Sequence, residues 1–105
     1  MRTLALTLFV FCISAFSAAA QNSVPDYRYF VTPDMDFYGS DVEALFDTDL
    51  TSCRNACDAN AQCQAFTFNT RSNSCFPKTN VSERTAYEGA VSAEKRPTDP
   101  VIMAL

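Results

Sequence analysis

The sequence predicts a small α+β domain, stapled by disulfide bonds, in which one helix packs on an antiparallel sheet. Three observations lead to this fold class. An apolar N-terminal segment has the pattern of an export signal, an even set of four cysteines follows it, and one helical pattern stands among short segments of alternating apolar and polar residues. A domain of this size buries only about 60 to 65% of its unfolded surface, so disulfides are expected to supply stability that the core alone lacks.

The N-terminal residues 1–20 have the pattern of an export signal. An uncharged apolar run, Leu4–Phe16, is followed by the small residues Ser17-Ala18-Ala19-Ala20, which suit signal peptidase. We expect cleavage before Gln21, which also removes Cys12. An uncleaved membrane anchor is the alternative, since the run is only slightly shorter than the about 20 apolar residues that span a bilayer.

The mature chain is expected to be acidic. Once the signal peptide is removed, 85 residues remain, and seven Lys and Arg face twelve Asp and Glu, for a net charge of −5. The basic residues are scattered among the acids: Arg28, Arg54, Arg71, Lys78, Arg84, Lys95 and Arg96. Because nucleic acid binding depends on clustered cations, we expect no nucleic acid partner. We also expect no membrane partner after signal cleavage, and a secreted or periplasmic location.

Two segments precede the helix. Residues 27–31 alternate tyrosine and valine with arginine and phenylalanine, which predicts a strand. Thr32-Pro33-Asp34 predicts a turn at its end. Residues 35–40 are expected to form a loop or a short strand closed by a glycine.

The helix is predicted over residues 50–59. Thr48 or Asp49 can cap its N-terminus. Leu50, Cys53 and Cys57 then lie at positions i, i+3 and i+7 on one face, so both cysteines point toward the core.

Three further strands are predicted after the helix. Residues 63–68 alternate and are the best candidate for the central strand, with two phenylalanines on one face. The turn residues 69–74 separate this segment from residues 75–78, which predicts a hairpin. A last strand is expected at residues 90–93. The domain is predicted over residues 21–96, with residues 97–105 as a C-terminal tail or linker.

The four remaining cysteines are Cys53, Cys57, Cys63 and Cys75, with the spacing C-x3-C-x5-C-x11-C. In an exported protein this even set predicts two disulfides, whereas a four-thiolate zinc site usually shows paired C-x2-C segments. Cys53 and Cys57 are disfavoured as partners, because i,i+4 neighbours on a helix are roughly 5 to 6 Å apart and a disulfide wants about 3.8 Å between Cβ atoms. The two other pairings both remain open at this point.

Three segments together resemble the PAN/apple domain: Thr51–Cys57, Cys63–Asn69 and Ser74–Lys78. In that family a C-x3-C helix is followed by C-x-A-F-x-[FY] and C-x-x-K. The resemblance covers roughly residues 26–94 and implies one helix packed on a curved antiparallel sheet. It further implies the pairs Cys53–Cys75 and Cys57–Cys63. The chain looks like the four-cysteine type, which lacks the disulfide that joins the ends of the larger type.

A narrower likeness concerns residues 45–48, 66–78 and 87–90. They look like the apple-like module at the front of some bacterial alpha-macroglobulin-type proteins, which are large exported protease traps. A chain of 105 residues offers no bait region or reactive thioester. This likeness therefore implies a structural accessory domain or a fragment of a larger periplasmic inhibitor.

The sequence offers little for catalysis. It contains no histidine, its mature cysteines are expected to be paired, and no serine stands in a nucleophile-elbow context. Asp34 with Asp36 and Asp47 with Asp49 could serve as acid/base pairs or hold calcium, but carboxylates in turns more often cap helices or face solvent. We predict that the chain is not an enzyme and has no cofactor and no metal site.

We instead predict an exported module that binds a protein or carbohydrate ligand through loops on a rigid scaffold. The candidate binding residues are Asn69, Arg71 and Asn73 in the predicted hairpin turn, followed by Tyr38 with Asp41 and Glu43. The competing interpretation is that the asparagines only make turn hydrogen bonds. The phenylalanines Phe66, Phe68 and Phe76 are expected in the core.

Overall fold

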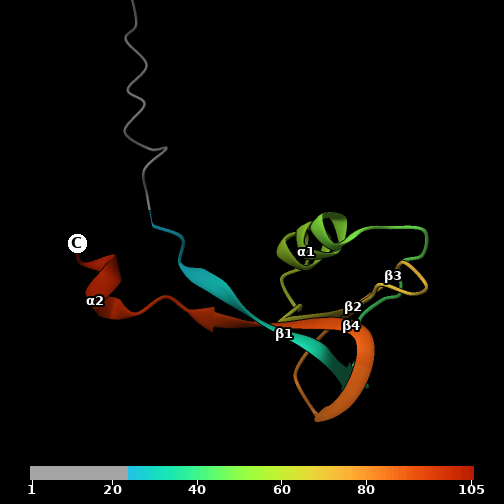
Figure 1. Cartoon of the computed structure of the whole chain (residues 1–105). Coiled ribbons are helices and arrows are strands. Elements are labelled where there is room, and N and C mark those ends of the chain that lie inside the picture. Colours follow the sequence, from blue (N-terminus) through green and yellow to red (C-terminus); the bar gives the residue numbers. More distant parts are fainter. Residues whose placement is uncertain (1–23) are drawn as a thin grey trace, which may run out of the picture.

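A computed structural model describes residues 24–105 of the chain (Figure 1). Its elements are β1 (Tyr27–Tyr38), α1 (Leu50–Ala59), β2 (Ala65–Asn69), β3 (Ser74–Lys78), β4 (Glu83–Pro97) and α2 (Pro100–Met103). The strands form one antiparallel sheet in the order β1-β4-β2-β3. This confirms the predicted fold class, a helix with an antiparallel sheet. The predicted signal peptide, residues 1–20, lies outside the described residues.

Strand β1 continues through the segment that was expected to form a turn. It pairs with β4 along its whole length, with a shift of register between Pro33 and Met35. Asp34 adopts a φ of 53°, and its carboxylate accepts a hydrogen bond of 3.1 Å from the Gly89 amide. The predicted end of the strand at residues 32–34 is therefore wrong, because the turn residues form a bulge that bends the strand without ending it.

Strand β4 is also much longer than the predicted strand at residues 90–93, and it is strongly bent. Arg84 and Glu94 form an ion pair of 2.8 Å although ten residues separate them. In a straight strand that separation is about 33 Å. The two ends of β4 therefore approach each other on one side of the sheet, and Figure 1 shows the resulting curl.

The curl places the second half of β1 over the sheet face opposite α1. Phe37 is only 1% exposed, and its amide donates a hydrogen bond of 3.1 Å to the Thr67 hydroxyl. The Thr67 and Ser92 hydroxyls lie 2.7 Å apart, and Ser92 donates to the Met35 carbonyl at 2.6 Å. Since both faces of β2 are covered, the residues of Ala65–Phe68 are all buried.

Helix α1 spans the predicted residues and begins at the predicted cap. Asp49 is the N-cap, and its carboxylate accepts a hydrogen bond of 2.7 Å from the Ser52 amide. This hydrogen bond lowers the pKa of Asp49. Cys53 and Cys57 are fully buried, as the helical spacing predicts.

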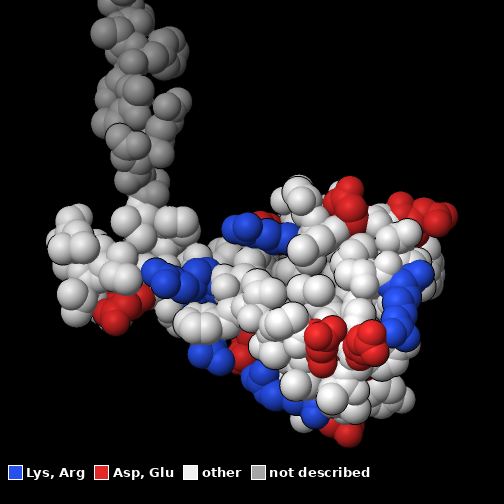
Figure 2. Space-filling view, in the orientation of Figure 1, with Lys and Arg blue, Asp and Glu red and all other residues white. Residues whose placement is uncertain are grey.

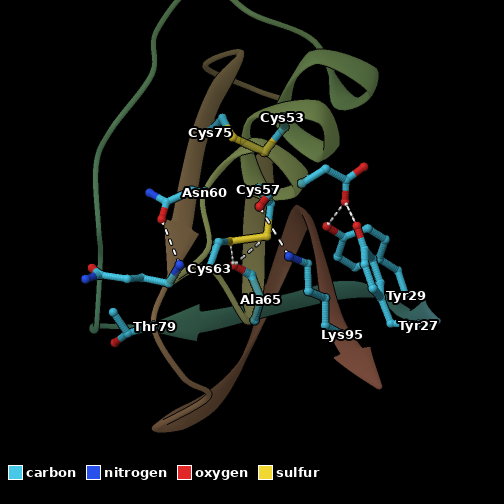
Figure 3. The surroundings of a disulfide bond; sticks show 12 residues. Tyr27, Tyr29, Cys53, Cys57, Asn60, Cys63, Ala65, Cys75, Thr79 and Lys95 are labelled. Atoms are coloured by element: carbon cyan, nitrogen blue, oxygen red, sulfur yellow. Dashed lines mark hydrogen bonds between the residues drawn. A yellow bond between two sulfur atoms is a disulfide. The ribbon is translucent and has the colours of Figure 1, made fainter. Parts of the chain in front are cut away.

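Two disulfides join the helix to its surroundings: Cys53–Cys75 and Cys57–Cys63 (Figure 3). This is the pairing that the family resemblance implies. The first bond ties α1 to β3, and the second ties the end of α1 to the segment that enters β2. The four cysteines pack with Phe66, Phe68 and Ala93 in the hydrophobic core.

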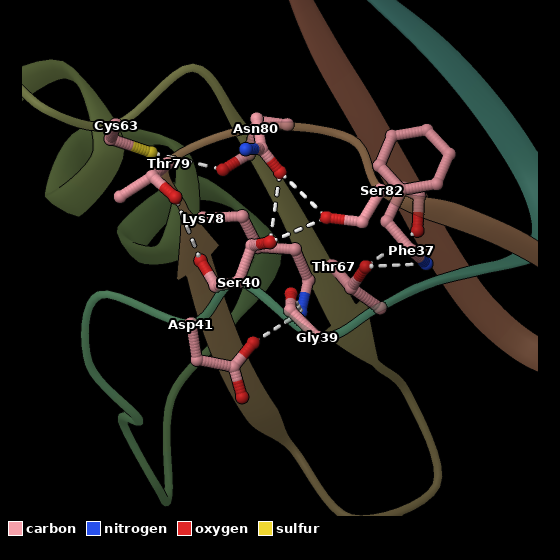
Figure 4. A network of polar contacts seen from close by, with 12 residues as sticks. Phe37, Gly39, Ser40, Asp41, Cys63, Thr67, Lys78, Thr79, Asn80 and Ser82 are labelled. Carbon is pink, nitrogen blue, oxygen red and sulfur yellow. Dashed lines mark hydrogen bonds and ion pairs between the residues drawn. The ribbon is translucent and has the colours of Figure 1, made fainter.

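The segment between β1 and α1 covers the outer edge of β3. Backbone hydrogen bonds run from Val42 to Pro77, in both directions between Leu45 and Cys75, and from Thr48 to Asn73. Lys78 is buried, and its ammonium group donates to the Gly39 carbonyl at 3.1 Å and pairs with the Asp41 carboxylate (Figure 4). These bonds close that edge of the sheet.

Removal of the disulfides tests the covalent frame. We expect Cys53→Ala with Cys75→Ala to cost more stability than Cys57→Ala with Cys63→Ala, because the bonds close separations of 22 and 6 residues. Loop-closure entropy gives about 3 and about 2 kcal/mol respectively. Urea unfolding of the two double variants measures both values. Equal stability of the variants and the parent would contradict the account.

Candidate functional site

Helix α1 covers only half of the sheet. It packs against β2 and β3 and does not closely approach β1 or β4. The helix-side face of β1 and β4 is therefore left open, and a groove of about 840 Å³ lies between this face and the helix. Tyr29, Val31 and Val91 form part of its floor.

One stripe of the helix forms the wall of the groove. Leu50, Arg54 and Asp58 lie at positions i, i+4 and i+8, with Thr51 and Asn55 beside them. Leu50 was predicted to share the core face of the cysteines, but it is 43% exposed. The sheet beneath it is not covered by the helix, so this side chain contributes to the groove.

Asp58 links the helix to β1 across the groove. One of its carboxylate oxygens accepts hydrogen bonds from the Tyr27 hydroxyl at 2.7 Å and from the Tyr29 hydroxyl at 2.6 Å (Figure 3). The two tyrosine rings meet edge to face at 5.9 Å, and Tyr29 meets Phe66 edge to face at 5.3 Å. These contacts fix the width of the groove.

The shared hydrogen bonds change the acidity of all three groups. Partial burial pushes the pKa of Asp58 upward, but the two hydroxyls, Lys95 and Arg54 outweigh it and hold that pKa below its usual value. Burial and then the bond to Asp58 raise the pKa of Tyr29. The bond to Asp58 is the main cause that raises the pKa of Tyr27. At neutral pH the carboxylate is thus charged and both phenols stay protonated as donors.

Two cations lie against the tyrosine rings. The guanidinium carbon of Arg54 is 5.4 Å from the ring centre of Tyr29, and the Lys95 ammonium is 4.8 Å from that of Tyr27. Lys95 also donates to the Cys57 carbonyl at 3.2 Å. Within residues 24–105 neither cation forms an ion pair. Figure 2 shows basic side chains on this side of the molecule, where β1 and β4 project, with acidic side chains beside some of them.

The groove combines an apolar floor with polar groups along one wall, which suits recognition of a ligand. Its lining, among the residues that the structure describes, contains no thiol or histidine. Phenols with a raised pKa are poor bases at neutral pH. Among residues 24–105 no group of His, Cys, Asp or Glu side chains is arranged to hold a metal ion. In the same part of the chain no helix is long and apolar enough to cross a membrane.

The residues that were predicted to bind through the hairpin turn make local contacts. The side chain of Asn69 accepts hydrogen bonds from the amides of Arg71 and Ser72, at 2.9 and 3.2 Å. Arg71 pairs with Glu88 at 3.4 Å, and Asn73 adopts a φ of 51° at the end of the turn. The asparagines therefore have turn roles, and a binding role for this hairpin stays a prediction.

The second predicted group lies elsewhere. Tyr38 is 66% exposed and borders a separate hollow of about 330 Å³, where Asp41 is paired with Lys78. Glu43 is exposed in the segment that covers β3. The structure does not bring Tyr38 into the groove, and its binding role also stays a prediction.

The carboxylates that were weighed as acid/base or calcium pairs have structural contacts. Asp34 binds the Gly89 amide in the bulge of β1, and Asp49 caps α1. Their partners in sequence, Asp36 and Asp47, form no ion pair within residues 24–105.

The groove residues were not identified from the sequence. The alternation of Tyr27, Tyr29 and Val31 does predict that they share one face of a strand. The helical spacing of Leu50, Arg54 and Asp58 equally predicts one stripe. The sequence does not show that α1 packs on β2 and β3 and leaves β1 uncovered. The two patterns form one site only because of this placement.

The family follows from a comparison with known protein families. The model of the PAN domain matches residues 27–98. The chain belongs to the PAN domain family. The described fold agrees, with its cysteine-bearing helix, two disulfides and four-stranded antiparallel sheet. PAN domains are in general non-catalytic modules that bind protein or carbohydrate.

One relative of this PAN domain is a maize protein named putative receptor protein kinase ZmPK1. It is 35% identical over 51 residues, which make up 49% of this chain and 6% of the relative. The match thus spans a small part of the length of that protein. The comparisons give no support to the narrower likeness to bacterial alpha-macroglobulin-type proteins.

The Asp58 cluster predicts a defined dependence of stability on pH. Folding lowers the pKa of Asp58. The carboxylate therefore stabilises the fold fully above the pKa that Asp58 has in the unfolded chain, and this stabilisation is lost as the pH falls through the pKa of Asp58 in the folded chain. We expect Asp58→Asn to be less stable than the parent at neutral pH, and the difference to shrink as the pH falls. Urea unfolding at a series of pH values measures it.

The control for this measurement is Asp47→Asn, which neutralises an exposed carboxylate outside the groove. Its stability should follow the parent at each pH. If Asp58→Asn did the same, the link between the tyrosines and the helix would be refuted.

Proposed function

We propose that the chain is an exported, non-catalytic module that binds a protein ligand in the groove between α1 and β1. The observation that carries the proposal is the composition of this groove. Val31 and Leu50 expose apolar surface, while the side chains of Thr51, Arg54 and Asn55 form no hydrogen bond to another side chain within residues 24–105. An apolar floor with a few converging polar groups is typical of a ligand site.

Export is supported by two features. The N-terminal residues have the pattern of a cleaved signal, and the two disulfides are of the kind that persists in oxidising compartments. The relative is named a receptor, and the match spans 6% of its length, which agrees with a ligand-binding module that is carried within larger proteins.

A protein ligand is favoured over a carbohydrate because cations already lie over the faces of the aromatic rings in the groove. Sugars commonly stack on open aromatic faces, but Lys95 and Arg54 lie over the rings of Tyr27 and Tyr29. Tyr29 is further in contact with Phe66. The groove therefore offers apolar side chains and hydrogen-bond donors more readily than a stacking platform.

The test is to fill the groove without disturbing the fold. Thr51→Trp adds a large ring on the groove side of α1. Ser52→Trp adds the same ring one residue later on the exposed helix surface, outside the groove. The parent and both variants are used as bait against the exported protein fraction of the native cell. We expect proteins retained by the parent and Ser52→Trp to be lost at least about tenfold with Thr51→Trp.

The same baits are applied to a panel of immobilised glycans. If the parent retains a glycan and Thr51→Trp does not, the ligand of the groove is a carbohydrate and not a protein. Equal capture of the same proteins by all three baits would contradict the proposal, because the groove would then not be the binding site. It would favour the alternative of a structural accessory domain that uses another surface.

A further inference from the structure

The backbone hydrogen bonds show which polar groups of β1 face outward. Lys95, the register partner of Tyr29, donates its amide to the Gln64 carbonyl at 2.8 Å, on the side of β4 away from β1. Tyr29 and Lys95 therefore exchange no bond, and the backbone N–H and C=O of Tyr29 point to the free side of β1. The Thr98 amide, which donates to the Asp26 carbonyl at 2.9 Å, fits the same alternation.

By this alternation Tyr27, Tyr29 and Val31 all turn their backbone groups outward. Within residues 24–105 no backbone hydrogen bond reaches them from that side, since β1 is the outermost strand. The next outward position is Pro33, which has no N–H and is tolerated where no ladder bond is needed. The other edge of the sheet, β3, is closed by the segment before α1. The first part of β1 is thus an open edge.

The same three residues also line the groove with their side chains. A strand added beside them would place every second side chain on the groove side of the sheet. There it would meet Val31, which is 60% exposed, and Leu50 across the groove. Apolar side chains are favoured at these positions of the added strand.

The remaining side chains of an added strand would face the opposite side. There β1 presents Arg28, which is exposed and forms no ion pair with the described residues, and Phe30, with the Arg96 guanidinium carbon 4.1 Å from its ring centre. Glu94 on this side already pairs with Arg84 and Arg96. Acidic side chains are favoured at these positions.

The charges on the groove side of the sheet also favour an acidic partner. Arg54 and Lys95 form no ion pair within the described part of the chain, and the nearby Asp58 is bound by two tyrosine hydroxyls. Although the chain is acidic as a whole, Arg28, Arg54 and Lys95 lie beside this edge and form no ion pair within residues 24–105. An acidic partner therefore complements it.

We propose that the outer edge of β1, at Tyr27–Val31, binds an extended segment of a partner protein in which apolar and acidic residues alternate, and that this segment adds to the sheet as a fifth strand. The inference rests on the proposed function and names the ligand chemistry of that groove. Backbone pairing gives affinity, and the two faces give the alternating preference.

The test uses a short synthetic peptide, blocked at both ends, in which valine and glutamate alternate. Binding to the disulfide-bonded exported form is followed by NMR. We expect the amides of Tyr27, Tyr29 and Val31 to become protected from hydrogen exchange. Val31→Pro removes one outward N–H without removing a bond to β4, and should weaken binding about tenfold. Val31→Thr changes the same side chain but keeps the N–H, so it should weaken binding by a several-fold smaller factor than Val31→Pro.

Two further arms test charge and ligand class. A peptide of alternating valine and lysine should bind at least about tenfold more weakly than the glutamate peptide, and Arg28→Gln should narrow that difference. Heparin serves as an acidic polysaccharide. Binding of heparin that is unaffected by Val31→Pro, with no protection of the β1 amides by the peptide, would overturn the strand-addition proposal.

These outcomes are separable from those for the groove itself. If Thr51→Trp abolishes capture of native partners while the glutamate peptide leaves the β1 amides unprotected, the proposed function stands and the added strand is refuted. If the peptide protects those amides but Thr51→Trp has no effect on capture, the edge is a binding surface and the groove is not.

Discussion

The fold depends on two disulfides that fix where helix α1 lies on the sheet. Cys53–Cys75 holds the helix to β3, and Cys57–Cys63 holds its end to the segment that enters β2. Both bonds attach to the same half of the sheet. A domain this small has too little core to position a helix by packing alone, so the covalent bonds decide its place. The other half of the sheet, β1 and β4, is left without a cover on that side.

The uncovered half is where the molecule carries its recognition surface. Tyr27 and Tyr29 bind Asp58 of the helix, which keeps the groove open at a fixed width, and Arg54 lies over one of the rings. The same strand presents free backbone groups at its edge, beside those side chains. The curl of β4 has a complementary effect, because it places Phe37 over the opposite face and leaves the projecting ends of β1 and β4 exposed. Side-chain groove and backbone edge thus form one continuous surface.

Local sequence patterns predicted the helix and the hairpin, but they did not predict how these elements are placed in the tertiary structure. The helix over residues 50–59 with its cap at Asp49 follows from capping and spacing, and the hairpin around residues 69–74 follows from turn chemistry. The length of β1 could not be predicted, because Asp34 sits in a bulge whose stability comes from the distant Gly89 amide. The groove was missed for a similar reason. Its tyrosines and helix stripe are visible in the sequence, but the distance between them is set by which strands the disulfides reach.

The disulfide to β3 keeps helix α1 on the sheet. Hydrogen exchange in the variant Cys53→Ala with Cys75→Ala tests it, under conditions where the variant remains folded. We expect amides in the middle of α1, such as that of Ala56, to exchange about a hundredfold faster than in the parent, while that of Ala93 in β4 changes far less. Helix amides that remain as protected as in the parent would show that packing alone holds the helix, and would contradict the account.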